Sequence, residues 1–144
     1  MIAYADSSVL VSLYSPDTNS IRAATALSTP QFPITIGSPV ELEVINAINL
    51  RIFRGEASAE EAEKAIGAFK RDILSGFLIL APLPRAAWEL AGRLSQNHSA
   101  TLGTRSLDIL QVSIALALKA QSFLTFDRRQ ARLARLEGLE TLPD

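Results

Sequence analysis

Cysteine is absent from this chain, and histidine occurs once, as His98. Without cysteine there are no disulfide bonds, thiolate zinc sites or cysteine nucleophiles, and a single histidine excludes a histidine-rich metal site. A metal ion bound by this chain would therefore be a hard cation held by oxygen ligands.

A strong net charge and a long hydrophobic run are also lacking. The formal net charge is -1, so binding to nucleic acid or to an anionic membrane would require a local basic patch. The most apolar stretch, 109–120, is interrupted by Gln111 and Ser113 and is shorter than the ~20 residues of a membrane span. The opening MIAYADSS has no basic segment of the kind that begins a signal peptide, so we expect a cytoplasmic protein.

Length and hydrophobic content predict one domain, residues 1–144, because 144 residues that are 48% hydrophobic can bury a substantial core. Short apolar runs predict strands, and longer stretches with helical spacing predict helices. The expected strands are 2–5, 34–36, 77–83, 122–126 and 139–142. The expected helices are 7–14, 20–27, 38–53, 58–75, 84–94, 106–120 and 128–136. Strands separated by helices predict a three-layer α/β/α sandwich with a mostly parallel central sheet.

Several helix ends carry recognisable capping residues. Ser38 is expected to cap its helix, with Pro39 in the first turn and Glu41 completing a capping box, and Ser58 with Glu61 forms a second box. Ser106 is expected to cap the helix that follows it. The polar stretch 95–105 is expected to be a mobile loop, in which His98 is a solvated residue.

Four carboxylates lie inside or at the end of apolar runs: Asp6, Glu43, Asp108 and Asp127. The runs are IAYADSSVLVSLY, SPVELEVINAI, SLDILQVSIALAL and SFLTFD, and the first three contain no lysine or arginine. Burying a carboxylate is costly unless a cationic partner meets it, so we expect the four acids to converge on a divalent cation. Asp6 and Asp127 follow predicted strands, and ligands bind beyond the carboxyl ends of strands in such sheets.

Each acid taken alone also has a structural interpretation. Asp6 can cap the helix that follows, Asp108 suits the positive end of its helix, and Asp127 can be a turn residue or a surface ion pair. Glu43 is harder to explain because Glu41 is already assigned to the capping box, although the helical periodicity does not separate the two glutamates. The combination of four acids at one end of the sheet, and not any single one, predicts a site.

The stretches YADSSVLVSLY, SPVELEVINAI, TRSLDILQVSIALAL and SFLTFDRRQARLA resemble those of the PIN domain over nearly the whole chain. The resemblance is closest to VapC-type toxin ribonucleases of bacterial toxin–antitoxin pairs. It implies a Mg²⁺- or Mn²⁺-dependent endoribonuclease that hydrolyses RNA phosphodiester bonds, and it selects Glu43 over Glu41. Asp6, Glu43, Asp108 and Asp127 would then be both the catalytic acids and the metal ligands.

The same resemblance implies a homodimer and an antitoxin protein as partner, with the apolar helices before Gly76 as contact surfaces. Related sequences often carry a histidine three residues after the third acid, where this chain has Gln111. Because position 111 is not one of the acids, the difference concerns the tuning of the site and not its presence.

Residues near the acids have supporting roles to test. Thr125 is either a partner of a carboxylate or an ordinary β-branched strand residue. Arg105, Arg128 and Arg129 flank the acids and are candidates for holding RNA phosphates. The remaining arginines of the last helix, 132 and 135, fit an ordinary solvated helix face.

Two other functions agree with parts of the sequence. A catalytically inactive PIN-like module that binds RNA or protein is one, although a degenerate domain usually lacks one of the acids. An aspartyl-nucleophile phosphatase is the other, but its chemistry requires a second acid two residues after the first, where this chain has Ser8.

Overall fold

The computed structural model describes residues 1–31 and 33–144, and in these residues five short strands form one parallel sheet. The strands are β1 (Ala3–Ala5), β2 (Ile34–Gly37), β3 (Leu78–Ala81), β4 (Ser122–Leu124) and β5 (Glu140–Leu142). Their order across the sheet is β3-β2-β1-β4-β5. The chain therefore builds outward from β1 in one direction and later returns to build outward in the other.

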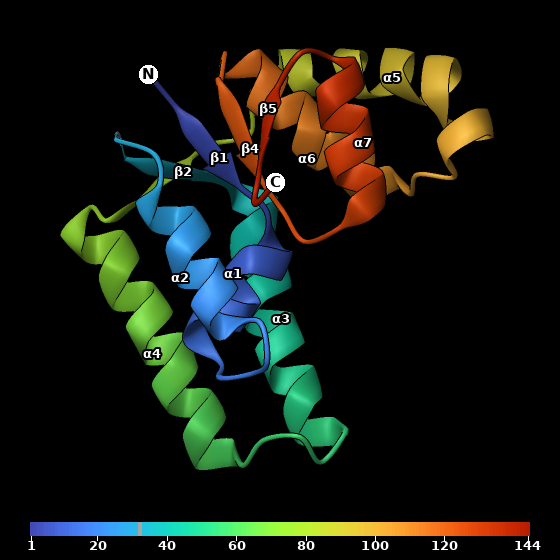
Figure 1. The fold of residues 1–144 in the computed structure, drawn as a ribbon. Helices are drawn as coiled ribbons and strands as arrows, with labels where there is room; N and C mark the ends of the chain where they lie inside the picture. The colour runs from blue at the N-terminus through green and yellow to red at the C-terminus, as the bar shows by residue number, and fades with distance from the viewer. Residues whose placement is uncertain (32) are drawn as a thin grey trace.

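Helices cover both faces of this sheet (Figure 1). The helices are α1 (Ser7–Tyr14), α2 (Ser20–Ser28), α3 (Ser38–Phe53), α4 (Ala59–Ser75), α5 (Ala86–Leu102), α6 (Ser106–Ala117) and α7 (Arg128–Leu136). Figure 1 shows α1 to α4 on one side of the sheet and α5 to α7 on the other. The predicted three-layer α/β/α sandwich is confirmed. None of the helices in the described part of the chain is long and apolar enough to cross a membrane.

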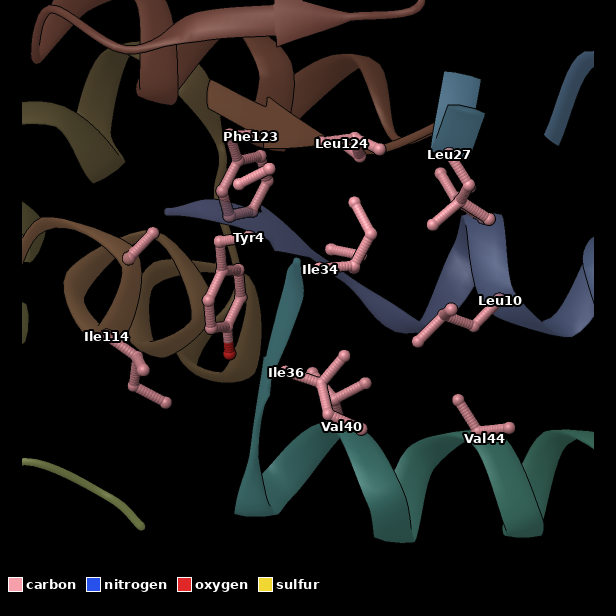
Figure 2. Close-up of a cluster of buried hydrophobic side chains, with 14 of the residues drawn as sticks. Tyr4, Leu10, Leu27, Ile34, Ile36, Val40, Val44, Ile114, Phe123 and Leu124 are labelled. Atoms are coloured by element: carbon pink, nitrogen blue, oxygen red, sulfur yellow. The ribbon is translucent and has the colours of Figure 1, made fainter. Parts of the chain in front are cut away.

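The core has two halves because side chains alternate across the sheet. Tyr4 and Phe123 are paired in register on one face, where their rings stack with centroids 5.7 Å apart next to Ile114 of α6. Ile36 points to the other face, toward Val40 of α3, and Val44 lies further along α3 near Leu10 of α1 (Figure 2). Both faces of the central strands are buried, so their sequences read as continuous apolar runs.

The expected loop at 95–105 is wrong, because α5 continues through this stretch to Leu102 and ends at Gly103, whose φ is +67°. The polar residues there lie along an exposed side of the helix, while Leu94 on its other side is buried in the core. His98 is half-buried, and its Nε2 atom lies 3.0 Å from Glu137 Oε1 of the segment after α7. The low hydrophobicity of residues 95–105 suggested a loop. The packing of α5 against α6, which maintains the helix, could not be seen in the local sequence.

Two of the predicted helix caps are displaced by one residue. Gly37 is the N-cap of α3 and Arg105 that of α6, so Ser38 and Ser106 are the first helical residues and cap neither helix. The capping box expected between Ser38 and Glu41 does not form in the described residues, whereas the box of Ser58 and Glu61 does, with bonds of 3.0 and 3.1 Å.

Three other elements are shorter than expected. Strand β4 ends at Leu124 and helix α6 at Ala117, where 126 and 120 were expected. Strand β3 similarly spans Leu78–Ala81 within the expected 77–83. The early end of β4 leaves Thr125 and Phe126 in the turn that leads to Asp127.

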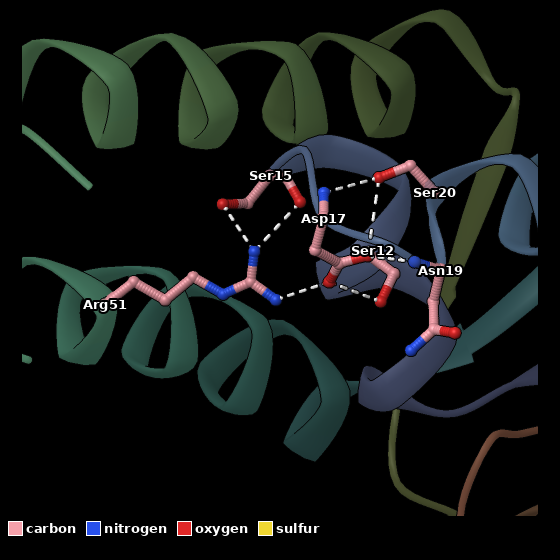
Figure 3. A network of polar contacts seen from close by, with 6 residues as sticks. All are labelled: Ser12, Ser15, Asp17, Asn19, Ser20 and Arg51. Carbon is pink, nitrogen blue, oxygen red and sulfur yellow. Dashed lines mark hydrogen bonds and ion pairs between the residues drawn. The ribbon is translucent and has the colours of Figure 1, made fainter. Parts of the chain in front are cut away.

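A polar network fastens α3 to the segment after α1 (Figure 3). Arg51 of α3 donates from Nη2 to Asp17 Oδ2 at 2.7 Å and from Nη1 to the Ser15 carbonyl oxygen at 2.9 Å. Ser12 Oγ also donates to Asp17 Oδ2, at 2.8 Å. Burial raises the pKa of Asp17, but the bonds from Arg51 and Ser12 outweigh it and lower the pKa below its usual value.

Candidate acidic active site

The four acids come from four elements that meet at the reversal point of the strand order. Strands β1 and β4 are neighbours whose connections run in opposite directions, and such a point is where open α/β sheets bind ligands. Asp6 follows β1, and its backbone N–H donates to the Leu124 carbonyl oxygen of β4 at 3.0 Å. Asp127 precedes α7, Asp108 lies in the first turn of α6, and Glu43 lies in α3.

Asp6 is 1% exposed and accepts hydrogen bonds from neutral donors only. As the N-cap of α1, its Oδ1 accepts from the Ser8 backbone N–H at 3.0 Å and from Ser8 Oγ at 2.7 Å. Its Oδ2 accepts from Thr125 Oγ1 at 2.6 Å. Burial raises the pKa of Asp6 to about 6, although these bonds oppose the rise. The capping role of Asp6 is confirmed, and it accounts for one oxygen of the carboxylate.

Thr125 links Asp6 to Asp127. Its hydroxyl donates to Asp6 and accepts from the Asp127 backbone N–H at 2.9 Å, so it acts as both donor and acceptor. The Ser8 hydroxyl accepts from the Phe126 backbone N–H at 2.9 Å, which holds the same turn against α1. Of the two interpretations of Thr125, the structure shows the carboxylate partner.

Gln130 links Asp127 to Asp108. Its backbone N–H donates to Asp127 Oδ1 at 3.0 Å, while its side-chain Nε2 donates to Asp108 Oδ1 at 3.0 Å. Asp108 is 8% exposed, and its Oδ2 lies 3.5 Å from Nε of Arg105. The carbonyl oxygen Oε1 of Gln130 is buried and has no hydrogen-bond partner in the described part of the chain. This oxygen can accept a further hydrogen bond next to Asp108.

Glu43 is held by a chain of donors that all point toward it. The Gly37 backbone N–H donates to the Tyr4 hydroxyl at 3.1 Å, and that hydroxyl donates to Gln111 Oε1. Gln111 Nε2 then donates to Glu43 Oε1 at 2.6 Å. Gln111 is 1% exposed, so this side chain is a buried group that orients Glu43.

The environment of Glu43 disfavours its charge. Burial raises its pKa, hydrogen bonds from Gln111 and from Ser7 Oγ at 3.2 Å lower it, and the nearby charge of Asp108 raises it again. The net effect is a raised pKa. Glu41, by contrast, makes no side-chain hydrogen bond within residues 1–31 and 33–144, so Glu43 is the glutamate that joins the network.

Hydrogen-bonding side chains link three of the four acids, Asp6, Asp127 and Asp108, but the acids do not form a complete metal-binding group. Among the residues that the structure describes, no three Asp, Glu or His side chains lie close enough together to hold a metal ion. The donor set still suits a hard divalent cation, because all the available ligands are carboxylate oxygens. Asp6 and Glu43 lack a cationic partner in the described residues, and the unpartnered Gln130 oxygen is suited to an ordered water of a hydrated ion.

The three arginines predicted to flank the acids differ from one another in their surroundings. Arg105 is mostly exposed and pairs with Asp108, whereas Arg128 and Arg129 are exposed at the start of α7. Sequence reasoning missed the orienting groups, which are Tyr4, Ser7, Ser8, Gly37 and Gln130. Only the serines had a local signal, since they directly follow Asp6 in a turn that caps a helix.

Fold and site together define a class of small α/β proteins with acidic residues at the reversal point of a parallel sheet. Within that class, the chain belongs to the PIN domain family, whose sequence profile matches residues 3–136. The resemblance to the PIN domain seen in the sequence is thus confirmed. No curated protein matches the chain in sequence.

Solved structures share the fold at low sequence identity. VapC20 of Mycobacterium tuberculosis, described as a sarcin-ricin loop cleaving toxin, has a TM-score of 0.70 and 16% identity, with 92% of this chain and 94% of that chain covered. FitAcB from Neisseria gonorrhoeae has a TM-score of 0.71 and 14% identity, covering 98% and 96%. VapBC2 from Rickettsia felis, bound to a DNA fragment from their promoter, has a TM-score of 0.64 and 19% identity, covering 98% and 97%. These likenesses establish the fold of the VapC structures for this chain.

Proposed function

We propose that this protein is a Mg²⁺- or Mn²⁺-dependent endoribonuclease and the toxin of a toxin–antitoxin pair. The observation that carries the proposal is the linkage of Asp6, Asp127 and Asp108 through Thr125 and Gln130 at the reversal point of the sheet. Glu43 is oriented there by Gln111 and lies near enough to Asp108 for the charge of that acid to raise its pKa. Membership of the PIN family and the fold shared with VapC20, a sarcin-ricin loop cleaving toxin, support it.

In this proposal Asp6, Glu43, Asp108 and Asp127 hold the cation. A bound divalent cation supplies a Lewis acid that polarises the scissile phosphodiester and stabilises charge on the leaving oxygen. The neutral groups around the acids orient them: Thr125 fixes Asp6, Gln111 fixes Glu43 and Gln130 fixes Asp108. These partners are uncharged, so they leave the acids without a competing cation, apart from Arg105 beside Asp108.

The partners follow from the same proposal. Neighbouring structures include VapBC complexes, which supports an antitoxin as the protein partner, and a homodimer in the cytoplasm is the expected state. The apolar helices before Gly76 expose large side chains suited to protein contacts, among them Phe53 (88% exposed) and Leu74 (87% exposed).

Substitution of the acids tests the activity. Asp6→Asn or Asp108→Asn should reduce metal-dependent cleavage of total RNA at least ~100-fold while the protein stays folded, because each removes a ligand charge. Glu43→Gln should cause a comparable loss, and Glu41→Gln, at a position outside the network, should retain activity. Cut ends mapped after incubation with Mg²⁺ or Mn²⁺ would provide the readout. Equal activity in the Glu43 and Glu41 variants would refute the assignment of Glu43.

A non-catalytic module that binds RNA or protein is the second candidate. It is favoured by the absence, within the described residues, of three acids arranged to hold a metal ion. RNA binding without any cleavage by the wild-type protein, in either metal, would select this function over the ribonuclease.

A further inference from the structure

A cavity of about 590 Å³ lies on the side of Asp127 that faces α2 and the end of the chain. Its lining includes Thr125, Phe126 and Asp127 from the turn after β4. Four arginines also line it: Arg22 from α2, and Arg128, Arg132 and Arg135 from α7. The cavity therefore adjoins the candidate active site but is built largely from residues outside it.

The four arginines outnumber the two acidic side chains in the lining of this cavity. None of the four arginines has an ion-pair partner within 4.0 Å in residues 1–31 and 33–144. The acidic side chains in the lining are Asp127 and Asp144, and Asp127 Oδ1 is already occupied by two backbone N–H groups of α7. Arg128 and Arg132 are four residues apart on one helix face, where like charges repel. An anion in the cavity would relieve that repulsion.

Two of the guanidinium groups are held in place. The guanidinium of Arg22 lies over the ring of Phe126, 5.0 Å from its centroid. Arg135 donates from Nε to Thr141 Oγ1 at 2.7 Å, which leaves its two terminal nitrogens for another acceptor. Such anchoring lowers the entropy lost on binding and marks these arginines as more than a solvated helix face.

Arg22 is the decisive member of the set. It is separated from the α7 arginines by about a hundred positions, so no local pattern accounts for its place beside them, and only the fold brings them together. Guanidinium groups pair well with phosphate oxygens, and a row of them suits a polyanion better than a single ion.

We propose that this arginine cavity binds the phosphate backbone of single-stranded RNA next to the scissile bond. The choice of RNA rests on the proposed ribonuclease function, whereas the choice of a phosphate chain rests on the four arginines. The strand would pass from the acids, over Asp127 and Phe126, into the cavity between α2 and α7. This path extends the basic surface beyond Arg128, which the sequence had already placed beside the acids.

RNA binding in the absence of divalent metal tests this site independently of cleavage. Fluorescence anisotropy with a labelled single-stranded oligoribonucleotide of mixed sequence, in EDTA, would measure the affinity over a range of salt concentrations. The salt dependence reports how many phosphate groups the protein contacts. The double variant R22Q/R132Q should bind about 10-fold more weakly at 0.1 M salt, and the slope of log K against log salt should fall by about 1.4. R22K should retain most of the slope because it keeps the charge.

A charge-matched control separates this site from general electrostatics. R54Q/K70Q removes two exposed charges, one just after α3 and one in α4, both outside the cavity lining, and should change the slope little. Equal behaviour of the two double variants would overturn the proposal, as would binding of polyglutamate at the arginines with unchanged RNA affinity, which would indicate an acidic protein segment instead. Weakened RNA binding in R22Q/R132Q with no cleavage by the wild type would support the cavity and refute the ribonuclease function.

Discussion

Position 37 requires glycine because of a close contact with Tyr4, and not because of its backbone conformation. Gly37 has φ -85° and ψ 160°, which any residue adopts. A Cβ atom at this position would lie 2.6 Å from the Tyr4 hydroxyl oxygen and 3.2 Å from Ile114 Cδ1. The absence of a side chain lets the buried tyrosine reach Gln111, and through it Glu43, so glycine here supports the orientation of a carboxylate.

Gly37→Ala should therefore lower the free energy of unfolding by about 1–3 kcal/mol, since the new methyl group overpacks the core at Tyr4. Urea unfolding would measure the loss. The double variant Y4F/G37A should be more stable than the sum of the single effects, because removing the hydroxyl relieves the clash.

Gly92→Ala is the matched control for this substitution. Gly92 lies inside α5, and a Cβ there meets no heavy atom within 4 Å, so alanine should stabilise by about 0.5–1 kcal/mol. Similar effects of the two glycine substitutions would show that the contact with Tyr4 is not tight.

Between elements, polar contacts hold the C-terminal part of helix α3. Helix α3 carries Glu43 toward the sheet, and its opposite end is tied by Arg51 to Asp17 and to the carbonyl oxygen of Ser15. The side chains of Arg51 and Asp17 are 17% and 24% exposed, so removing one partner would leave the other charge largely shielded from water and unpaired.

Asp17→Asn should destabilise the protein by about 1–3 kcal/mol at neutral pH, because it weakens the bonds from Arg51 and Ser12. The folded-state pKa of Asp17 is lowered, so its stabilising effect is present above the unfolded pKa and is lost as the pH falls through the folded value. Thermal unfolding at pH 7 and at acidic pH would show the variant and wild type converging. Glu63→Gln, at an exposed position of α4, should leave the pH 7 stability nearly unchanged, and a loss equal to that of Asp17→Asn would contradict this account.

For the whole molecule, the sequence was sufficient to predict the layers and the end of the sheet where the acids lie. Parallel strands buried on both faces leave short apolar runs, and the acids that follow β1 and β4 meet because those strands are neighbours. Local sequence could not predict pairs such as Tyr4 with Gln111 or Thr125 with Asp6, which lie more than a hundred residues apart.

The wrong predictions have the same origin in tertiary packing. The second half of α5 is polar, yet it remains helical because Leu94 is buried and the helix packs against α6. At the start of α3, Gly37 ends β2 and caps the helix at once, so Ser38 is left one position too late to act as the cap. Local signals located these elements, whereas their ends depended on the rest of the molecule.

Without metal, the buried charge of Asp6 should make the whole protein less stable as the pH rises from about 4 to 6. The folded-state pKa is about 6 against 3.8 for the unfolded chain, so the folded protein binds more protons in this window. The free energy of unfolding should fall by about 3 kcal/mol across it, and Glu43 acts in the same direction. Urea unfolding in EDTA would measure this slope, which Asp6→Asn should reduce; an identical slope in the variant would contradict the cause.

Mg²⁺ or Mn²⁺ should offset this electrostatic cost, because a cation that binds the four carboxylates stabilises the folded state only. At a concentration 100 times the dissociation constant the gain is about 2.7 kcal/mol, or roughly 5–10 °C in Tm for a chain of this size. Thermal unfolding in millimolar metal, with potassium chloride matched for ionic strength, would measure it. Asp108→Asn should lose most of the shift, while Glu41→Gln should keep it, since Glu41 lies outside the network. An equal shift in all three proteins would mean that the cation binds elsewhere, and no shift in wild type with either ion would remove the acids as a metal site.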